Sequence, residues 1–277
     1  MRLDAHNHFW HYSADEYGWI TDEMAVLRRD FLPEDLAREQ AAIGFEGSVV
    51  VQARQTLEET KWLLGLADEH PLIKGVVGWV DLCSDEVAEQ LERFVGHPHF
   101  CGVRHVLQDE ANDRFMLREE FLRGIGVLAE FGVPYDILIM PGHLPYACDL
   151  AERFPEQAFV LNHIAKPFIR DGVMEPWATD IRRLAEHPNV FCKASDMVTE
   201  ADWERWRPAD FHPYLDVVFE AFGTERVMIG SDWPVCTVAG SYAEVMGIVL
   251  GYVERLRSAE RDAILGENAA SVYEMER

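Results

Sequence analysis

The chain has 277 residues, of which 48% are hydrophobic and 27% are charged, and its formal net charge is −24. These proportions are those of an ordinary globular protein, and no apolar run approaches the roughly 18 residues of a membrane span, so we expect no membrane partner and a cytoplasmic location. The 49 acidic residues against 25 basic ones make a surface that repels phosphate backbones, which argues against nucleic acid as a partner.

The first expected strand, residues 3–8, ends in two histidines. Side chains alternate along a strand, so His6 and His8 lie on one face while Asn7 lies on the other. Neutral imidazole is the commonest protein ligand of transition metals, and such a pair offers two ligands from one rigid element. Taken alone, the pair is equally compatible with two histidines that only form hydrogen bonds.

Apolar, β-branched runs recur along the whole chain and alternate with stretches of helical pattern. The expected strands are residues 3–8, 48–53, 74–80, 101–107, 133–139, 159–164, 190–194 and 227–232. Expected helices include residues 33–40, 85–95, 119–130, 181–186 and 242–256, with a helical tail over 258–276.

Strict alternation of strands and helices predicts parallel strands joined by crossover helices. Eight such units in a chain of this length predict an α/β fold with one domain, 1–277, that forms a single distorted (β/α)8 barrel. A doubly wound open sheet is the alternative. It is disfavoured because no Gly-x-Gly-x-x-Gly motif follows the first strand.

Polar side chains stand at the ends of these strands, where the active site of such a barrel lies. The sixth run ends near His163, and the eighth delivers Asp232 before Pro234 stops it. Arg104 and His105 are neighbours in the fourth run and cannot both point inward. Further polar residues at strand ends are Gln52, Arg54, Asp81, Tyr135, Asp136, Lys193 and Ser195.

Four segments together resemble the amidohydrolase superfamily over almost the full length. They are Asp-Ala-His-Asn-His (4–8), Asn-His-Ile-Ala-Lys-Pro (162–167), Gly-Ser-Asp-Trp-Pro (230–234) and Leu-Gly-Glu-Asn-Ala-Ala-Ser-Val-Tyr (265–273). Within that superfamily the chain is most similar to the sugar-lactonase branch of L-fuconolactonase and L-rhamnonolactonase types, which is related to 2-pyrone-4,6-dicarboxylate lactonase. The resemblance implies a (β/α)8 barrel that hydrolyses esters or amides.

The resemblance also implies a metal site. His6, His8 and Asp232 match the metal ligands of the superfamily, and His163 matches a histidine that either completes the site or polarises the carbonyl. One divalent cation is implied, and ligand preference favours zinc. No bridging lysine stands in the fourth run, and Lys193 replaces a histidine that many relatives carry, so we expect no second ion. Because some lactonases of this branch work without metal, the resemblance leaves open whether the ion is essential.

We therefore predict a lactonase that opens a small sugar lactone of the L-fuconolactone type, in L-fucose catabolism. Asp232 would take the proton from water and return it to the leaving ring oxygen, with His163 assisting. The predicted substrate-binding residues are Gln52, Arg54, Arg104, His105, Tyr135, Asp136 and Trp233. The alternatives are a metal-dependent decarboxylase, a hydrolase of a non-sugar lactone such as a pyrone dicarboxylate, and a binding protein on an inactive barrel. A homo-oligomer is compatible with all of them.

Overall fold

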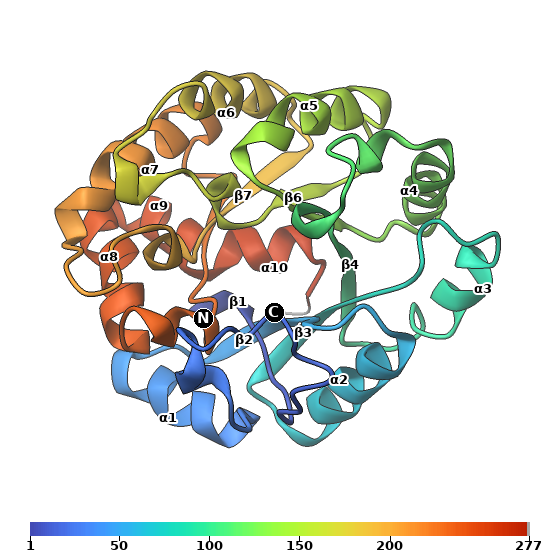
Figure 1. Cartoon of the computed structure of the whole chain (residues 1–277), viewed down its shortest axis with the longest axis horizontal. Coiled ribbons are helices and arrows are strands. Elements are labelled where there is room, and N and C mark those ends of the chain that lie inside the picture. Colours follow the sequence, from blue (N-terminus) through green and yellow to red (C-terminus); the bar gives the residue numbers. More distant parts are fainter. Residues whose placement is uncertain (276–277) are drawn as a thin grey trace.

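The computed structural model describes residues 1–275 and consists of eight strands inside a ring of helices (Figure 1). The strands follow one another around the sheet in chain order, and every neighbouring pair is parallel. They are β1 (Leu3–Asn7), β2 (Gly47–Val51), β3 (Ile73–Gly78), β4 (Phe100–Val106), β5 (Tyr135–Leu138), β6 (Phe159–Leu161), β7 (Val190–Ala194) and β8 (Val227–Ile229).

The sheet closes between its first strand and the residues that follow its last one. The amide of His8 donates to the carbonyl of Trp233 over 2.7 Å, and the amide of Asp232 donates to the carbonyl of His6 over 2.8 Å. The fold is therefore the distorted (β/α)8 barrel that the alternation predicts. This closure also sets the two strand-one histidines beside Asp232.

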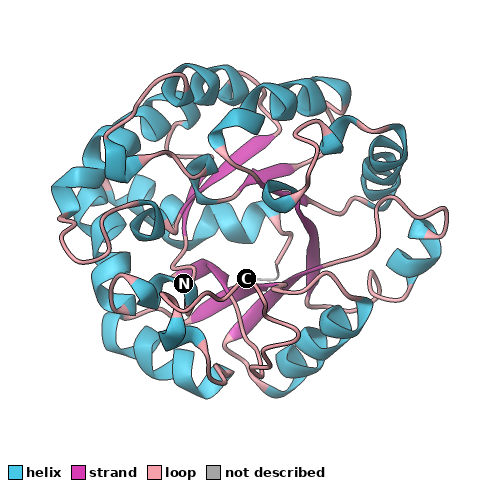
Figure 2. Ribbon diagram, viewed as in Figure 1, coloured by secondary structure: helices cyan, strands magenta, loops and turns pink. Residues whose placement is uncertain are grey.

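Helices connect the strands and cover the outside of the barrel (Figure 2). They are α1 (Pro33–Ile43), α2 (Leu57–Glu69), α3 (Val87–Glu92), α4 (Glu119–Phe131), α5 (Leu144–Arg153), α6 (Trp177–Ala185), α7 (Pro208–Phe222), α8 (Tyr242–Val253), α9 (Ser258–Asp262) and α10 (Asn268–Val272). Side chains of Thr56 and Ser241 cap the first amides of α2 and α8, and Gly44 and Gly132 end α1 and α4 in the left-handed conformation. Over residues 1–275, no helix combines the length and apolarity that crossing a bilayer requires.

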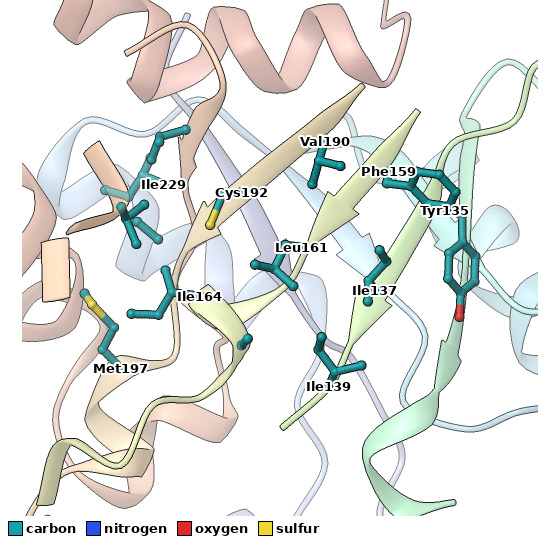
Figure 3. Packing of buried hydrophobic residues seen from close by; sticks show 14 of the residues in the cluster. Tyr135, Ile137, Ile139, Phe159, Leu161, Ile164, Val190, Cys192, Met197 and Ile229 are labelled. Carbon is teal, nitrogen blue, oxygen red and sulfur yellow. The ribbon is translucent and has the colours of Figure 1, made fainter. Parts of the chain in front are cut away.

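Two hydrophobic layers lie on opposite faces of the strands. The outer layer packs between strands and helices, and neighbouring strands contribute to it at matching registers, as with Ile137, Leu161 and Cys192 of β5, β6 and β7 (Figure 3). The inner layer fills the barrel, where Val160 and Met228 lie. Because both faces are buried, the strands read as continuous apolar runs.

The C-terminal helix α10 closes the inside of the barrel and crosses its centre in Figure 1. Ala269, Val272 and Tyr273 pack into the inner layer, and the hydroxyl of Tyr273 donates to Asp136 Oδ1 of β5 over 2.7 Å. This end of the barrel is therefore filled by the chain itself, which leaves the opposite end for a ligand.

All eight expected strands and all five expected interior helices are present, with ends that differ by a few residues. Among the strands, the largest differences concern the sixth and eighth, which end at Leu161 and Ile229 because the chain then turns into the left-handed conformation at His163 and Asp232. The expected domain 1–277 and the expected tail 258–276 reach beyond residue 275 and so lie partly outside the described residues.

Candidate active site

Three potential metal ligands meet where the barrel closes. His6 Nε2 lies 3.2 Å from His8 Nε2, and Asp232 Oδ1 lies 3.0 Å from His8 Nε2 and 3.3 Å from His6 Nε2. All three side chains are buried. The alternation along β1 and the closing hydrogen bonds are sufficient to produce this convergence.

A second carboxylate, that of Asp4, holds Asp232 in place through its neighbour Ser231. Asp4 accepts hydrogen bonds from the amide of Ser231 over 2.9 Å and from its hydroxyl over 2.6 Å, and also from the amide of His6 over 3.2 Å. Burial raises the pKa of Asp4 to about 6, although these hydrogen bonds oppose the rise. Asp4 therefore connects the start of β1 to the segment after β8.

The two strand-one histidines are neutral. Burial lowers the pKa of His8 to about 3, and burial together with the nearby Lys193 ammonium lowers the pKa of His6 well below its usual range. His8 Nδ1 donates to the carbonyl of Val51 over 2.7 Å, so the lone pair of His8 Nε2 points at Asp232 Oδ1. Burial raises the pKa of Asp232 itself to about 6.

This donor set fits one cation. Two atoms with lone pairs, His8 Nε2 and Asp232 Oδ1, stand 3.0 Å apart, which requires a proton or a cation between them. Ligands bound tetrahedrally at about 2.0 Å lie about 3.3 Å from one another. The separations of 3.0 to 3.3 Å among His6, His8 and Asp232 agree with that geometry.

Two cationic side chains flank His6. Arg104 Nη1 lies 3.2 Å from His6 Nε2, and Lys193 Nζ lies 3.4 Å from His6 Nδ1. Lys193 is also paired with Asp136 over 2.6 Å. A cation bound at His6 Nε2 would therefore displace the contact between that atom and Arg104 Nη1. Without such a cation, the Arg104 guanidinium itself supplies positive charge beside His6.

His163 lies beside this group and belongs to a second one. Its Nε2 is 3.8 Å from Asp232 Oδ1, and its Nδ1 is hydrogen-bonded to Ser195 Oγ over 2.9 Å. Ligand atoms of His163, Asp196 and Asp232 all lie within 4.8 Å of one another. Burial, with Lys166 nearby, lowers the pKa of His163 well below its usual range, so this imidazole is neutral too.

A cavity of about 320 Å³ opens above these groups. Apolar and aromatic side chains line it together with charged and polar ones, a composition that suits a small, partly polar ligand. Its lining includes His8, Trp10, Trp19, Met24, Arg104, Val106, Gln108, Leu138, His163, Lys166, Asp196, Thr199, Glu200, Trp203, Asp232 and Val235.

Among the predicted substrate-binding residues, Arg104 lines the cavity and its neighbour His105 points away. His105 is hydrogen-bonded to Glu110 over 2.8 Å and stacks on Phe115. Gln52 lies against Arg104, whose Nη2 donates to Gln52 Oε1 over 3.1 Å, so Gln52 positions the guanidinium.

The other predicted substrate-binding residues contact protein groups instead of the cavity. Arg54 forms an ion pair with Glu16. Tyr135 faces the outer hydrophobic layer, whereas its neighbour Asp136 faces inward, beneath the site. Trp233 packs against aromatic rings under the first loop.

Among the lining residues that sequence reasoning missed, four are polar or aromatic residues used below: Lys166, Asp196, Glu200 and Trp203. Two of them had a signal. Lys166 stands three residues after His163 in the quoted Asn-His-Ile-Ala-Lys-Pro segment, and Asp196 follows the seventh strand much as Asp232 follows the eighth. Glu200 ends a short 3-10 helix after β7 and Trp203 lies in the turn that follows, a course that the sequence pattern does not predict.

The chain is also similar to known proteins along its whole length. The sequence profile of the amidohydrolase family matches residues 3–275. An L-fucono-1,5-lactonase of Burkholderia multivorans is 41% identical over 99% of this chain and 96% of its own length, and one of Burkholderia ambifaria is 35% identical over 100% and 97%. The crystal structure of an amidohydrolase from Burkholderia multivorans with bound zinc has a TM-score of 0.95 at 40% identity and covers 100% of both chains.

Proposed function

This chain belongs to the amidohydrolase family, and from that premise we propose that it hydrolyses a sugar 1,5-lactone of the L-fucono-1,5-lactone type to the open sugar acid. The observation that carries the proposal is the buried Asp232 carboxylate, 3.0 to 3.8 Å from three neutral imidazoles at the floor of a cavity. The two lactonase relatives support the choice of substrate.

In this reaction Asp232 acts as base and then as acid. Its carboxylate takes a proton from a water molecule whose oxygen attacks the lactone carbonyl carbon. The bond between that carbon and the ring oxygen then breaks, and the proton passes from Asp232 to the ring oxygen, which leaves as a hydroxyl. Arg104 and His163 face the negative charge that develops on the carbonyl oxygen, a contribution worth about 3 kcal/mol for one well-placed donor.

His6, His8 and Asp232 would hold one divalent ion, for which we propose zinc, in line with nitrogen and carboxylate ligand preference and with the zinc-bound relative. When bound, such an ion polarises a carbonyl and lowers the pKa of water. Arg104, the one predicted substrate-binding residue that lines the cavity, is proposed to contact the lactone. We assign the reaction to L-fucose catabolism in the cytoplasm.

The first test replaces the proposed base. Asp232→Asn keeps the size of the side chain but cannot accept the proton, so kcat should fall by about 10³-fold, within the range for loss of general acid–base catalysis. The measurement is acid release from a panel of aldono-1,4- and 1,5-lactones with a pH indicator. Asp15→Asn, at an exposed position, is the matched control and should keep the wild-type rate. Near-normal turnover in Asp232→Asn, or carbon dioxide in place of acid, would contradict the proposal.

The second test counts the metal. Wild-type protein equilibrated with zinc and then desalted should retain about one ion per chain by elemental analysis, whereas His8→Ala should retain less than a tenth, because it loses one ligand of three. Equal zinc content in the two proteins would contradict the proposal that His8 binds this ion. If protein stripped of metal by a chelator still hydrolyses the lactone, the ion is not essential, and Arg104 and His163 polarise the carbonyl without it.

A further inference from the structure

A left-handed turn after β6 carries a lysine that the proposed mechanism does not use. Four successive residues, His163 to Lys166, have φ between 48° and 59°, a conformation that costs about 1–2 kcal/mol per non-glycine residue. With three residues per turn, His163 and Lys166 emerge on the same side. Both line the cavity, while Ile164 is buried in the outer hydrophobic layer (Figure 3).

Two carboxylates orient the Lys166 ammonium. Its Nζ lies 2.7 Å from Asp196 Oδ2 and 3.2 Å from Glu200 Oε1. Burial alone would lower the pKa of Lys166, but these two carboxylates outweigh it and raise the pKa, so the side chain stays charged. An ammonium has three N–H donors, and two are occupied. The third is available to the cavity that Lys166 lines.

The carboxylates offer acceptors to the same cavity. Asp196 is 1% exposed, and its Oδ1 receives no hydrogen bond from an N–H or hydroxyl group within residues 1–275, because the group beside it is another carboxyl, that of Asp232. A buried acceptor without a donor is costly, so this oxygen is suited to a ligand that brings an O–H or N–H.

We propose that Lys166, Asp196 and Glu200 form a hydroxyl clamp that holds ring hydroxyls of the lactone and so determines specificity, an inference that rests on the proposed function. A sugar hydroxyl both donates and accepts, so it can donate to a carboxylate oxygen of the clamp while accepting from the ammonium. Trp19 and Trp203 supply flat apolar surfaces in the same cavity for the C–H faces of the ring.

The hydrogen-bond donors and acceptors of the clamp determine which lactones are accepted. A neutral polyhydroxy ring satisfies all three groups without adding charge. A ring that carries carboxylates, as a pyrone dicarboxylate does, brings acceptors where Asp196 and Glu200 need donors, and it has no hydroxyl to offer. The clamp therefore favours sugar lactones over dicarboxylate lactones.

The test compares substrates that differ by one hydroxyl. Purified wild-type protein and Glu200→Ala are assayed with L-fucono-1,5-lactone and its 2-, 3- and 4-deoxy analogues. Loss of Glu200 should lower kcat/KM about tenfold or more on the parent lactone, and less than threefold on at least one deoxy analogue, because that analogue lacks the hydroxyl that Glu200 holds. Glu204→Ala, an exposed residue four positions later, is the control and should match wild type on all four lactones.

Lys166→Met is assayed with the same four lactones. It should likewise lower kcat/KM strongly on the parent lactone and only weakly on at least one deoxy analogue. A circular dichroism spectrum checks that it folds; if it does not, Glu200→Ala decides alone. Equal losses on all four lactones, or no loss on any, would overturn the clamp. If wild-type protein hydrolyses none of the four, the proposed function fails instead, so the two failures are distinguishable.

Discussion

Buried carboxylates bind backbone amides in several parts of this protein. Glu59 does so outside the candidate active site. Glu59 belongs to the first turn of α2 and accepts the amides of Ala53 (3.3 Å) and Arg54 in the loop after β2. Its side chain is fully buried. Burial raises the pKa of Glu59 to about 7, against the opposing effect of these amides.

This shift predicts a pH dependence of stability. In an unfolded chain Glu59 loses its proton near pH 4.5, whereas the folded state keeps it up to about pH 7. Between these values the folded state binds more protons, so the free energy of unfolding falls as pH rises and is level above pH 7. We expect a loss of roughly 2–3 kcal/mol between pH 4.5 and 8 that Glu59→Gln lacks.

Urea denaturation of the two proteins across that pH range checks this prediction. Asp4, Asp196 and Asp232 also have raised pKa values, so the wild-type profile is a sum, and only the difference from Glu59→Gln isolates Glu59. Parallel profiles for the two proteins would contradict the prediction.

Among the elements, α4 makes an unusually close contact with the chain that follows β3. A Cβ added at Gly124 would lie 2.2 Å from the backbone carbonyl oxygen of Leu82, whereas one at Gly126 would meet only Phe154, at 3.8 Å. Gly124 therefore lets α4 approach the loop over Leu82, and Gly126 has no such role.

The two glycines predict opposite effects in one helix. Gly124→Ala should lower the free energy of unfolding by about 2 kcal/mol or more, because backbone must move to make room. Gly126→Ala should raise it by about 1 kcal/mol, because alanine favours the helix and fits. Urea unfolding of both variants measures the pair, and a stabilised Gly124→Ala protein would show that this approach is looser than the structure indicates.

At the scale of the whole molecule, the net charge of −24 means that the folded chain repels itself at neutral pH. Salt screens this repulsion, so the melting temperature at pH 7.5 should rise by roughly 2–4 °C between 10 and 300 mM sodium chloride, about 1 kcal/mol for a chain of this size. The control is the same titration near pH 4.7, the isoelectric point, where the effect should vanish. An equal rise at both pH values would point to a cause other than net charge.

Much of the architecture follows from the sequence. Eight apolar runs alternate with helical patterns, and in a parallel barrel that alternation determines both strand order and the common end at which the strand-end residues lie. His6, His8, His163 and Asp232 were therefore expected together, and the structure brings each within 3.0 to 3.8 Å of a neighbour in the group.

Only the tertiary structure decided which neighbouring side chain faces the ligand. Alternation along a strand separates Arg104 from His105 and Tyr135 from Asp136, but both faces of a parallel barrel are buried, so hydrophobicity does not say which face is the inner one. The segments beyond the strand ends are set by packing and ion pairs between distant residues. The left-handed turn that brings Lys166 to Asp196 therefore had no counterpart in local sequence pattern.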